Sequence, residues 1–469
     1  MTDNCPLEDQ TPIDRRLEVR NASATMLNWT RRDFFSSQAL GAVLGVLGMV
    51  RPSAASASAV GVDSPLGRPA NGANAGAAGA REAPRTEAAY ADNIYTKMFG
   101  VTPVVGAAGA LSSYGNSRMR PEVIRAMADA SEFLVDLDEL NRAAGRRIAE
   151  IMKAEAAMVT SCAAGSMMLG AAACLTGTDR QNIDALPHPT WPRRVCLMQK
   201  AHRFLYDRAY RAAGMTIVDV ETRDQLINAI DGTTAMIAGL AGLGSTGLER
   251  NGTSAIALED LVAIGKKAGV PVLIDAAGQL PPVTNLTRFT GMGADLVCFS
   301  GGKALGGPSS TGILAGRRDL IEAAAMNGSP NQNVGRGMKV NREEIVGLVV
   351  ALESYLKLDH DRVFSEWTRK SQYIADQLRG IPGLKATLDA GSEGYAVVVL
   401  DWDPKVFSMT VPQAGALLKA GRPRIVCWTF LGAQRARVQP PALEDGDEII
   451  IAKRLRRFFL EEAPRVGRG

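Results

Sequence analysis

A lysine that follows directly on an apolar run is the first residue whose surroundings suggest chemistry. Lys303 closes the glycine-rich stretch 300–303 (SGGK), immediately after the run 295–299 (DLVCF). A buried strand that ends in such a turn places the lysine in a cleft. Desolvation and nearby charge can remove its proton there and make it a nucleophile for an aldehyde. A lysine that only contacts phosphate is the alternative, but the P-loop spacing is absent because Ala304 follows Lys303.

An aspartate ends an earlier apolar run. Residues 271–275 (PVLID) end in Asp275, and the small Ala277 follows two positions later. A carboxylate at the carboxyl end of a strand lies where open α/β sheets bind ligands. Such a group can pair with the pyridine nitrogen of pyridoxal phosphate and keep it protonated, while Ala277 leaves room for a flat ring. An aspartate that caps the next helix stays open as the alternative.

A third stretch could hold a phosphate. The apolar run 156–159 leads into small residues and then into a helical pattern rich in Met, Leu and Ala. A helix that starts with small residues exposes its backbone N–H groups to an anion, although small residues also favour tight packing. The predicted contacts to the cofactor phosphate are Cys162, Ala163, Ala164, Gly165 and Ser166, with Ser300 and Gly301 beside them.

Histidine and cysteine give no metal site. The three histidines are His188, His202 and His360, and the six cysteines are scattered without a CxxC pair. We therefore predict no metal. His202 shortly follows the apolar run 195–198, so it could stack on a cofactor ring or could be an ordinary histidine at the core edge. Both interpretations remain open.

The elements that must position these residues alternate along the chain. Short apolar runs are separated by helical patterns such as 223–230 and 258–267. This order predicts an α/β fold with a mostly parallel sheet covered on both faces. A long helical pattern begins near Glu343, and a smaller α+β unit follows it. The apolar runs are 156–159, 195–198, 216–220, 235–239, 270–274, 295–299 and 312–314.

Three motifs together resemble a known family. They are DAA at 275–277, SGGK at 300–303 with GGP at 306–308, and GRGMKVNREEI at 335–345. In combination they are similar to the selenocysteine synthase-like group of fold-type I pyridoxal-phosphate enzymes, within the aminotransferase superfamily. That group includes L-seryl-tRNA(Sec) selenium transferase and D-glucosaminate-6-phosphate ammonia-lyase. The resemblance spans about residues 93–430 and is strongest over 270–352.

The resemblance implies a fold and a set of roles. The expected fold is a large domain with a mostly parallel seven-stranded sheet and a smaller α+β C-terminal domain. It implies Lys303 as the Schiff-base lysine and Asp275 as the partner of the pyridine nitrogen. Arg336 and Lys339 would bind a substrate carboxylate or phosphate, unless they form a solvated basic turn. It also implies active sites shared across a homodimer or a larger homo-oligomer.

The N-terminal region has the features of a targeting signal. Arg31 and Arg32 precede an uncharged stretch over 36–50, and small residues follow at 55–59. This order resembles a twin-arginine signal, recognised by the twin-arginine export machinery, and predicts a periplasmic protein. A soluble N-terminal helix in a cytoplasmic protein is the alternative. Whether the signal is cleaved is left open.

The chain therefore divides into four predicted regions. Residues 1–59 are the signal region, and 60–92 are a flexible Gly/Ala-rich linker. Residues 93–340 form the cofactor-binding large domain, with 93–125 as a part that can pack with the small domain instead. Residues 341–469 form the small domain.

Composition excludes several classes. The chain has 469 residues, of which 46% are hydrophobic and 22% charged, which is typical of globular proteins and not of disordered, collagenous or polytopic membrane chains. The formal net charge of +4, without any dense basic run, gives little support to a nucleic-acid partner. In place of the N-terminal region that contributes to tRNA binding in the selenium transferase, this chain has the predicted signal region and linker. It also has Cys162 where the resemblance leads us to expect a glycine.

These features favour a small-molecule substrate. We predict an enzyme that acts through a Cα carbanion of a small amino acid or amino sugar acid, by β-elimination of the ammonia-lyase type. In this prediction Lys303 binds pyridoxal 5'-phosphate and then removes the Cα proton. The alternatives are a selenium transferase-like or aminotransferase activity, and a non-catalytic exported protein that keeps the fold.

Overall fold

The computed structural model describes residues 83–242, 249–250, 252–390, 394–427 and 436–465, all within one compact unit, Arg81–Gly469. The predicted signal region, with Arg31 and Arg32, and most of the predicted linker lie outside these residues. Within the described part, no helix combines the length and the apolar character needed to cross a membrane.

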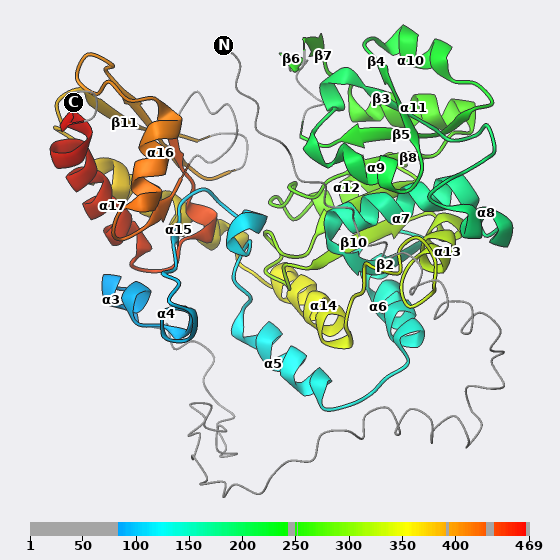
Figure 1. The fold of residues 1–469 in the computed structure, drawn as a ribbon, viewed down its shortest axis with the longest axis horizontal. Helices are drawn as coiled ribbons and strands as arrows, with labels where there is room; N and C mark the ends of the chain where they lie inside the picture. Colours follow the sequence, from blue (N-terminus) through cyan, green and yellow to red (C-terminus); the bar gives the residue numbers. More distant parts are fainter. Residues whose placement is uncertain (1–82, 243–248, 251, 391–393, 428–435, 466–469) are drawn as a thin grey trace, which may run out of the picture. The chain divides into compact units, whose positions relative to one another are not determined.

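A seven-stranded sheet forms the larger lobe (Figure 1). The strand order across it is β2-β10-β9-β8-β5-β3-β4, and β10 pairs antiparallel with both neighbours, whereas the other pairs of neighbouring strands in this sheet are parallel. The sheet is therefore mostly parallel, as predicted. Its strands are β2 (Ala156–Ser161), β3 (Val195–Gln199), β4 (Thr216–Val220), β5 (Thr234–Leu240), β8 (Val272–Asp275), β9 (Leu296–Ser300) and β10 (Thr311–Gly316).

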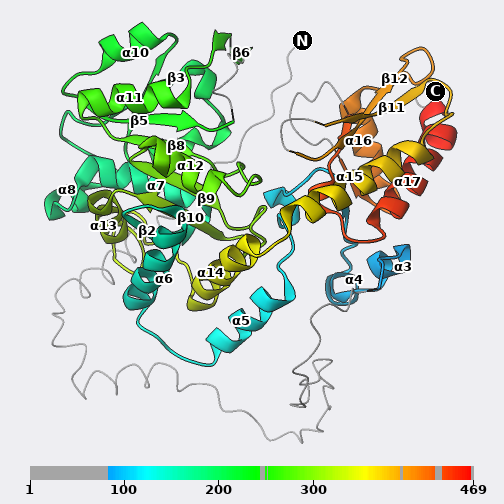
Figure 2. The ribbon, with the colours of Figure 1, turned by 180° about the vertical axis from the view of Figure 1, so that it is seen from behind.

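Helices cover both faces of this sheet, as Figures 1 and 2 show from opposite sides. Alternate residues of each strand enter different cores: Ile274 packs in one hydrophobic cluster and Leu273 in the other. This alternation follows from the period of two in a strand. The helices of this lobe are α5 (Pro121–Ser131), α6 (Leu137–Met152), α7 (Cys162–Thr176), α8 (Arg180–Ala185), α9 (Arg208–Ala212), α10 (Arg223–Ala229), α11 (Leu258–Ala268), α12 (Asn285–Met292), α13 (Arg318–Asn327) and α14 (Arg342–Leu356).

Local sequence explains where two of these helices begin. Asp136 caps α6 by accepting the Glu139 N–H, and Asn341 with Glu344 forms a reciprocal capping box at α14. Such caps satisfy N–H groups that have no partner inside the helix and stabilise it by about 1 kcal/mol each. The cap of α14 matters for the site, because α14 follows the basic segment that carries Arg336.

A second lobe has its own core. Strands β11 (Leu384–Asp389), β12 (Val397–Trp402) and β14 (Ala436–Val438) form an antiparallel sheet. Strand β1 (Val105–Gly106) pairs in parallel with β13 (Ile425–Val426). Strands β6 (Glu249–Arg250) and β7 (Thr253–Ser254) pair only with each other, as a short antiparallel hairpin. The helices of the second lobe are α3 (Glu87–Ala91), α4 (Ile94–Phe99), α15 (His360–Gln377), α16 (Val411–Ala420) and α17 (Asp447–Arg457).

The two cores divide the chain less simply than the predicted boundary at residue 340. Tyr90 and Val105 are buried in the core of the second lobe, so the start of the described chain belongs there. Conversely, Leu348 and Leu352 of α14 are buried in the core of the larger lobe. The chain thus enters through the small lobe, builds the large lobe, and returns after α14.

Candidate functional site

Lys303 lies in a tight turn between β9 and β10. Backbone hydrogen bonds close this turn: the Gly301 N–H donates to the Thr311 carbonyl at 2.9 Å, and the Gly307 N–H donates to the Gly301 carbonyl at 2.9 Å. A Cβ at Gly301 would lie 2.1 Å from Thr311 Oγ1, so only glycine fits there. Gly301 therefore serves the close packing of the turn, and Lys303 itself is half-buried.

A segment from far earlier in the chain holds the outside of this turn. The Ser117 hydroxyl lies 2.7 Å from the Gly302 carbonyl and 2.6 Å from the Lys303 carbonyl. The Arg120 guanidinium donates to the Leu305 carbonyl at 2.7 Å. Three carbonyl groups of the lysine turn therefore form hydrogen bonds with residues 117–120. We refer to residues 116–120 as the strap.

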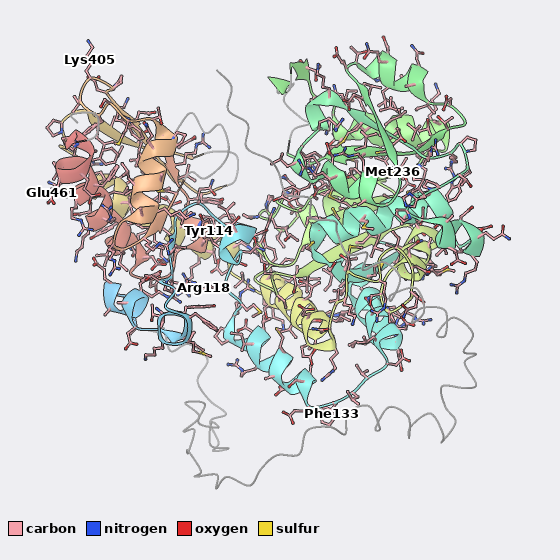
Figure 3. The ribbon with its side chains drawn as sticks, in the orientation of Figure 1. Tyr114, Arg118, Phe133, Met236, Lys405 and Glu461 are labelled. Carbon is pink, nitrogen blue, oxygen red and sulfur yellow. The ribbon has the colours of Figure 1, made fainter. Side chains whose placement is uncertain are left out.

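The strap also reaches the second lobe. Arg118, labelled in Figure 3, forms ion pairs with Glu444 at 3.0 Å and with Asp447 at 3.4 Å. The Asp447 carboxylate also accepts the Tyr90 hydroxyl at 2.7 Å. Side chains of the small lobe therefore contact the same strap that holds the lysine turn. Nothing in the residue pattern of the strap pointed to this role, because its partners are backbone carbonyls about 185 residues away in sequence.

Asp275 is the last residue of β8 and is only 5% exposed. Its Oδ1 accepts the Ala277 N–H at 2.8 Å and lies 3.5 Å from the Cys298 thiol. Burial raises the pKa of Asp275, whereas the Ala277 N–H, the Lys303 charge and the Cys298 thiol act to lower it. Since the Ala277 N–H comes from just beyond the strand, Asp275 anchors its own turn and does not cap a helix.

Lys303 and Asp275 lie at the same end of neighbouring strands. The Lys303 Nζ is 3.5 Å from the position that a Cβ on Gly278 would take, so the lysine reaches over the turn that follows Asp275. The Lys303 charge is also among the influences on the pKa of Asp275. Ala277, half-buried between the two, adds no bulk. The structure therefore brings together the three residues that the sequence separated.

The start of α7 provides N–H donors. Cys162 begins the helix with a φ of 53°, a left-handed conformation that favours glycine, which explains why glycine is expected there. The Cys162 N–H donates to the Ser310 carbonyl at 2.6 Å. The next two N–H groups, those of Ala163 and Ala164, have no acceptor inside the helix because they belong to its first turn. These two are the donors best placed for an anion.

Ser166 and Gly165 contact the neighbouring parts of the large lobe. The Ser166 side chain is fully buried, 2.6 Å from the Thr160 hydroxyl and 3.2 Å from the Ile313 carbonyl. Its hydroxyl therefore joins α7 to the sheet, and it also lies 3.4 Å from the Cys162 carbonyl at the start of the helix, so its contact to a phosphate stays a prediction. A Cβ at Gly165 would lie 2.9 Å from Ser161 Oγ, so this glycine permits close packing. Ser300 ends β9 at 9% exposure.

Both ring nitrogens of His202 contact backbone groups. Its Nδ1 accepts the Leu240 N–H at 2.9 Å, and its Nε2 lies 3.1 Å from the Ile256 carbonyl. Since Nδ1 accepts, Nε2 carries the proton and donates it to that carbonyl. The ring is 0% exposed. The burial and these hydrogen bonds favour the core-edge interpretation of His202, and the stacking of its ring on a cofactor stays a prediction.

The basic segment lies against the start of α7. Met338 Sδ would be 3.6 Å from a Cβ on Gly165, so the chain between Arg336 and Lys339 passes over the first helical turn. Arg336 is half-buried with Nη1 3.4 Å from the Ser329 hydroxyl, and Lys339 is exposed. Both residues therefore flank a segment that lies against the start of α7, with no contact to Lys303 or Asp275 among the bonds described.

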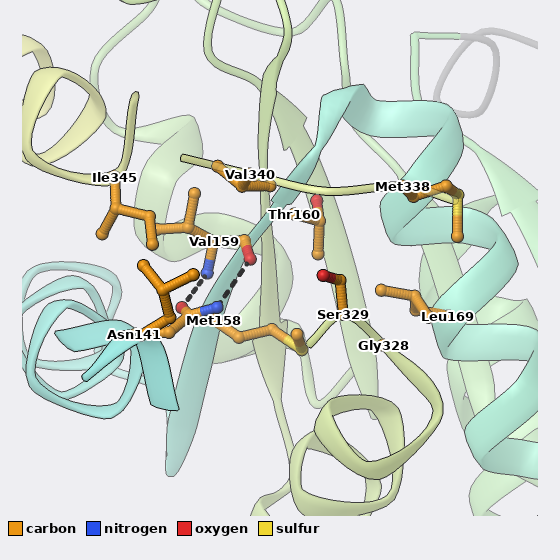
Figure 4. Close-up of a pocket in the computed structure, with 11 residues that line it drawn as sticks. Asn141, Met158, Val159, Thr160, Leu169, Gly328, Ser329, Met338, Val340 and Ile345 are labelled. Carbon is orange, nitrogen blue, oxygen red and sulfur yellow. Dashed lines mark hydrogen bonds between the residues drawn. The ribbon is translucent and has the colours of Figure 1, made fainter. Parts of the chain in front are cut away.

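A cavity opens beside the same segment at the free edge of β2 (Figure 4). Asn141 of α6 closes one side: its amide donates to the Val159 carbonyl at 3.1 Å and accepts the Val159 N–H at 2.9 Å. Lys303 and Asp275 are absent from its lining, so this cavity is not the site of the predicted chemistry. Its lining is Leu137, Asn141, Met158, Val159, Thr160, Leu169, Gly328, Ser329, Met338, Val340 and Ile345.

In the described part of the chain, no group of three or more His, Cys, Asp or Glu side chains is arranged to hold a metal ion. The cysteines there are free thiols: Cys162, Cys174, Cys196, Cys298 and Cys427. The Cys298 thiol lies within hydrogen-bond distance of Asp275. Its position opposite Asp275 could have been found only by pairing the two strands.

Comparison with known proteins places this site in a family. The family model described as L-seryl-tRNA selenium transferase matches residues 210–367. The 5'-C-glycyluridine monooxygenase-decarboxylase of a Streptomyces species is 32% identical over 77% of this chain and 91% of its own. The D-glucosaminate-6-phosphate ammonia lyase of Salmonella typhimurium is 28% identical over 78% of this chain and 97% of its own.

Structural comparison agrees. A solved structure of D-glucosaminate-6-phosphate ammonia-lyase superposes with a TM-score of 0.67 at 27% identity, covering 79% of this chain and 99% of the other. The residues that the family model matches, 210–367, include both Asp275 and Lys303. The chain therefore belongs to the selenocysteine synthase-like group of fold-type I pyridoxal-phosphate-dependent enzymes.

Proposed function

We propose that this chain binds pyridoxal 5'-phosphate between Lys303, Asp275 and the start of α7. The observation that carries the proposal is the convergence of a lysine and a buried carboxylate at adjacent strand ends. The residues present fit the cofactor: Asp275 has both its hydrogen bonds on Oδ1, which leaves Oδ2 for a ring nitrogen. The N–H groups of Ala163 and Ala164 would hold the phosphate.

Each residue then has a defined task. Lys303 Nζ would hold the cofactor through its aldehyde, and as a free amine it would take the proton from the substrate Cα. Asp275 holds a proton at the ring nitrogen. The cofactor supplies an electron sink for the pair of electrons left at Cα. Arg336 and Lys339, at the phosphate end of the site, are the candidates to bind an acidic group of the substrate.

The proposed reaction is β-elimination from a small amino acid or amino sugar acid. The similarity to D-glucosaminate-6-phosphate ammonia lyase over most of both chains supports this choice. A near-neutral net charge of +4 favours a small substrate over tRNA. The selenium transferase model matches only residues 210–367, which gives less support to that alternative.

A second candidate is loss of the Cα carboxylate in place of the Cα proton. It is favoured by one observation, the name of the 32% identical relative, a monooxygenase-decarboxylase. Both reactions use the same electron sink and differ in the bond at Cα that breaks. Product analysis separates them: elimination releases a β-substituent and ammonia, whereas the second candidate releases carbon dioxide.

The test begins with an absorbance spectrum of the purified chain and reduction with borohydride. Lys303→Ala should lose the visible band and the covalent label, while Lys267→Ala, at an exposed position on α11, should keep both. The wild-type chain is then supplied with D- and L-amino acids and amino sugar acids, and ammonia and keto acid are measured. Retention of the band in Lys303→Ala would show that the lysine is wrongly assigned.

We also propose a homo-oligomer and export. Exposed apolar side chains support the first: Phe133, labelled in Figure 3, and Leu134 are 75% and 91% exposed. Sedimentation of the purified chain tests it. Export through the twin-arginine route is supported by the order of features around Arg31 and Arg32. A reporter fused to residues 1–60 should be exported, and changing both arginines to lysine should stop it.

A further inference from the structure

Cys298 faces Asp275 directly across the sheet. In the parallel ladder between β8 and β9, Asp275 and Cys298 are register partners, and their side chains project to the same face. The thiol sulfur lies 3.5 Å from Asp275 Oδ1, within hydrogen-bond distance for sulfur. Cys298 is 0% exposed. The contact is therefore built into the sheet and shielded from water.

The direction of this hydrogen bond follows from protonation. Burial, and after it the Asp275 charge, raise the pKa of Cys298 well above its usual range. The thiol therefore keeps its proton at neutral pH and donates it to the carboxylate. Oδ1 thus receives two donors from different elements, the Cys298 thiol from β9 and the Ala277 N–H at 2.8 Å from the turn.

No other side chain nearby takes this place. Tyr210, also 0% exposed, lies close enough that the Asp275 and Cys298 charges act, after burial, to raise its pKa. Within the described part of the chain, however, its hydroxyl has no hydrogen-bond partner. The thiol, and not the phenol, is the side-chain donor to Asp275.

We infer that Cys298 is a positioning residue: its thiol fixes the plane of the Asp275 carboxylate so that Oδ2 points at the ring nitrogen of the cofactor. A carboxylate tied through one oxygen by two donors cannot turn freely about its last bond. It also stays ionised more readily, since both donors stabilise the charged form. The inference rests on the proposed function, because the ring nitrogen belongs to the proposed cofactor.

The test compares two ligands on the same protein. Pyridoxal phosphate and its 1-deaza analogue, in which a CH replaces the ring nitrogen, are titrated into cofactor-stripped protein and followed by absorbance. Cys298→Ala and Cys298→Val remove the donor, and Cys298→Ser keeps one. Cys196→Ala is the matched control, because Cys196 is a thiol at 0% exposure in β3 of the same sheet.

Loss of the donor should lower the affinity for pyridoxal phosphate about fivefold in the alanine and valine variants. The serine variant and Cys196→Ala should stay within about twofold of wild type. The 1-deaza analogue should bind every variant within about twofold, since it offers Asp275 no ring nitrogen. Comparing both ligands on one variant cancels any partial loss of stability, and the valine variant replaces the alanine variant if the latter does not fold.

Two results would overturn the inference. One is wild-type affinity for pyridoxal phosphate in both Cys298→Ala and Cys298→Val. The other is an equal loss for both ligands, which would mean that Cys298 acts through packing alone. Failure of the proposed function looks different: the wild-type chain itself would then show no saturable binding of pyridoxal phosphate.

Discussion

Ser117 offers the sharpest test of how Lys303 is held. Its hydroxyl lies 2.7 Å from the Gly302 carbonyl and 2.6 Å from the Lys303 carbonyl, and its own N–H donates to the Gly302 carbonyl at 2.9 Å. Ser117→Ala removes only the hydroxyl. Both carbonyls then keep a backbone donor, because the Gly306 N–H donates to the Lys303 carbonyl at 3.0 Å.

The expected cost follows from these bonds. A hydroxyl has one proton, so one net hydrogen bond is lost, worth about 0.5–1.5 kcal/mol. The free energy of unfolding should fall by about the same 0.5–1.5 kcal/mol. Because both acceptors of the hydroxyl, the Gly302 and Lys303 carbonyls, belong to the lysine turn, this turn loosens. Affinity for pyridoxal phosphate should then fall about three- to tenfold.

Urea denaturation and cofactor titration measure the two effects. Ser131→Ala is the matched control: the Ser131 hydroxyl also donates to a backbone carbonyl, that of Ala128 at 2.6 Å, but at an exposed position. It should change stability by less than about 0.5 kcal/mol and leave affinity unchanged. Ser117→Thr, which keeps the hydroxyl, should restore both properties. Wild-type stability and affinity in Ser117→Ala would refute the role of the strap.

Three further predictions concern packing, pH and assembly. Gly145→Ala puts a Cβ 2.0 Å from the Ala157 carbonyl oxygen and should destabilise by about 2 kcal/mol or more, whereas Gly291→Ala, with nothing within 4 Å, should be neutral or slightly stabilising in urea. Burial raises the pKa of Tyr90 from 10.0 to about 12, so stability present below pH 10 is lost as the pH rises towards 12. Between pH 10 and 12 the free energy of unfolding should therefore fall by about 2–3 kcal/mol more in the wild type than in Tyr90→Phe, which has no phenol to ionise. An equal fall of the free energy of unfolding with pH in both proteins would contradict this prediction. Leu134→Asp should lower the apparent mass in sedimentation, and an unchanged mass would exclude this surface as the interface.

Much of the secondary structure was predictable because it depends on local pattern. Each of the seven apolar runs became a strand of the central sheet, and the helical pattern near Glu343 became α14. The helices α15 and α16 and the strands β11 and β14 were not predicted. Strand β14 has only three residues, too few to show a pattern in the sequence. Strand order was not predictable either, since periodicity carries no information on which strands pair.

The site divides in the same way. The motif around Lys303 and the strand end at Asp275 could be found from residue type and spacing. Ser166 was predicted at the phosphate, and only the structure shows that its hydroxyl contacts Thr160. The residue type of His202 suits a stacking role as well as a structural one, and only the structure shows its hydrogen bonds to Leu240 and Ile256, which favour the structural role.

By itself the sequence therefore determined the residue types available for chemistry and the strands that carry them. Those features depend on residues that are neighbours in the chain, so the alternation of apolar runs with helical patterns and the glycine-rich turns can be recognised from the sequence. The tertiary structure alone decided which distant groups meet. It paired Asp275 with Cys298 across β8 and β9, and it laid Ser117 on the turn that holds Lys303. Such contacts join residues separated by 23 and 186 positions, and they exist only once the sheet has formed its strand order.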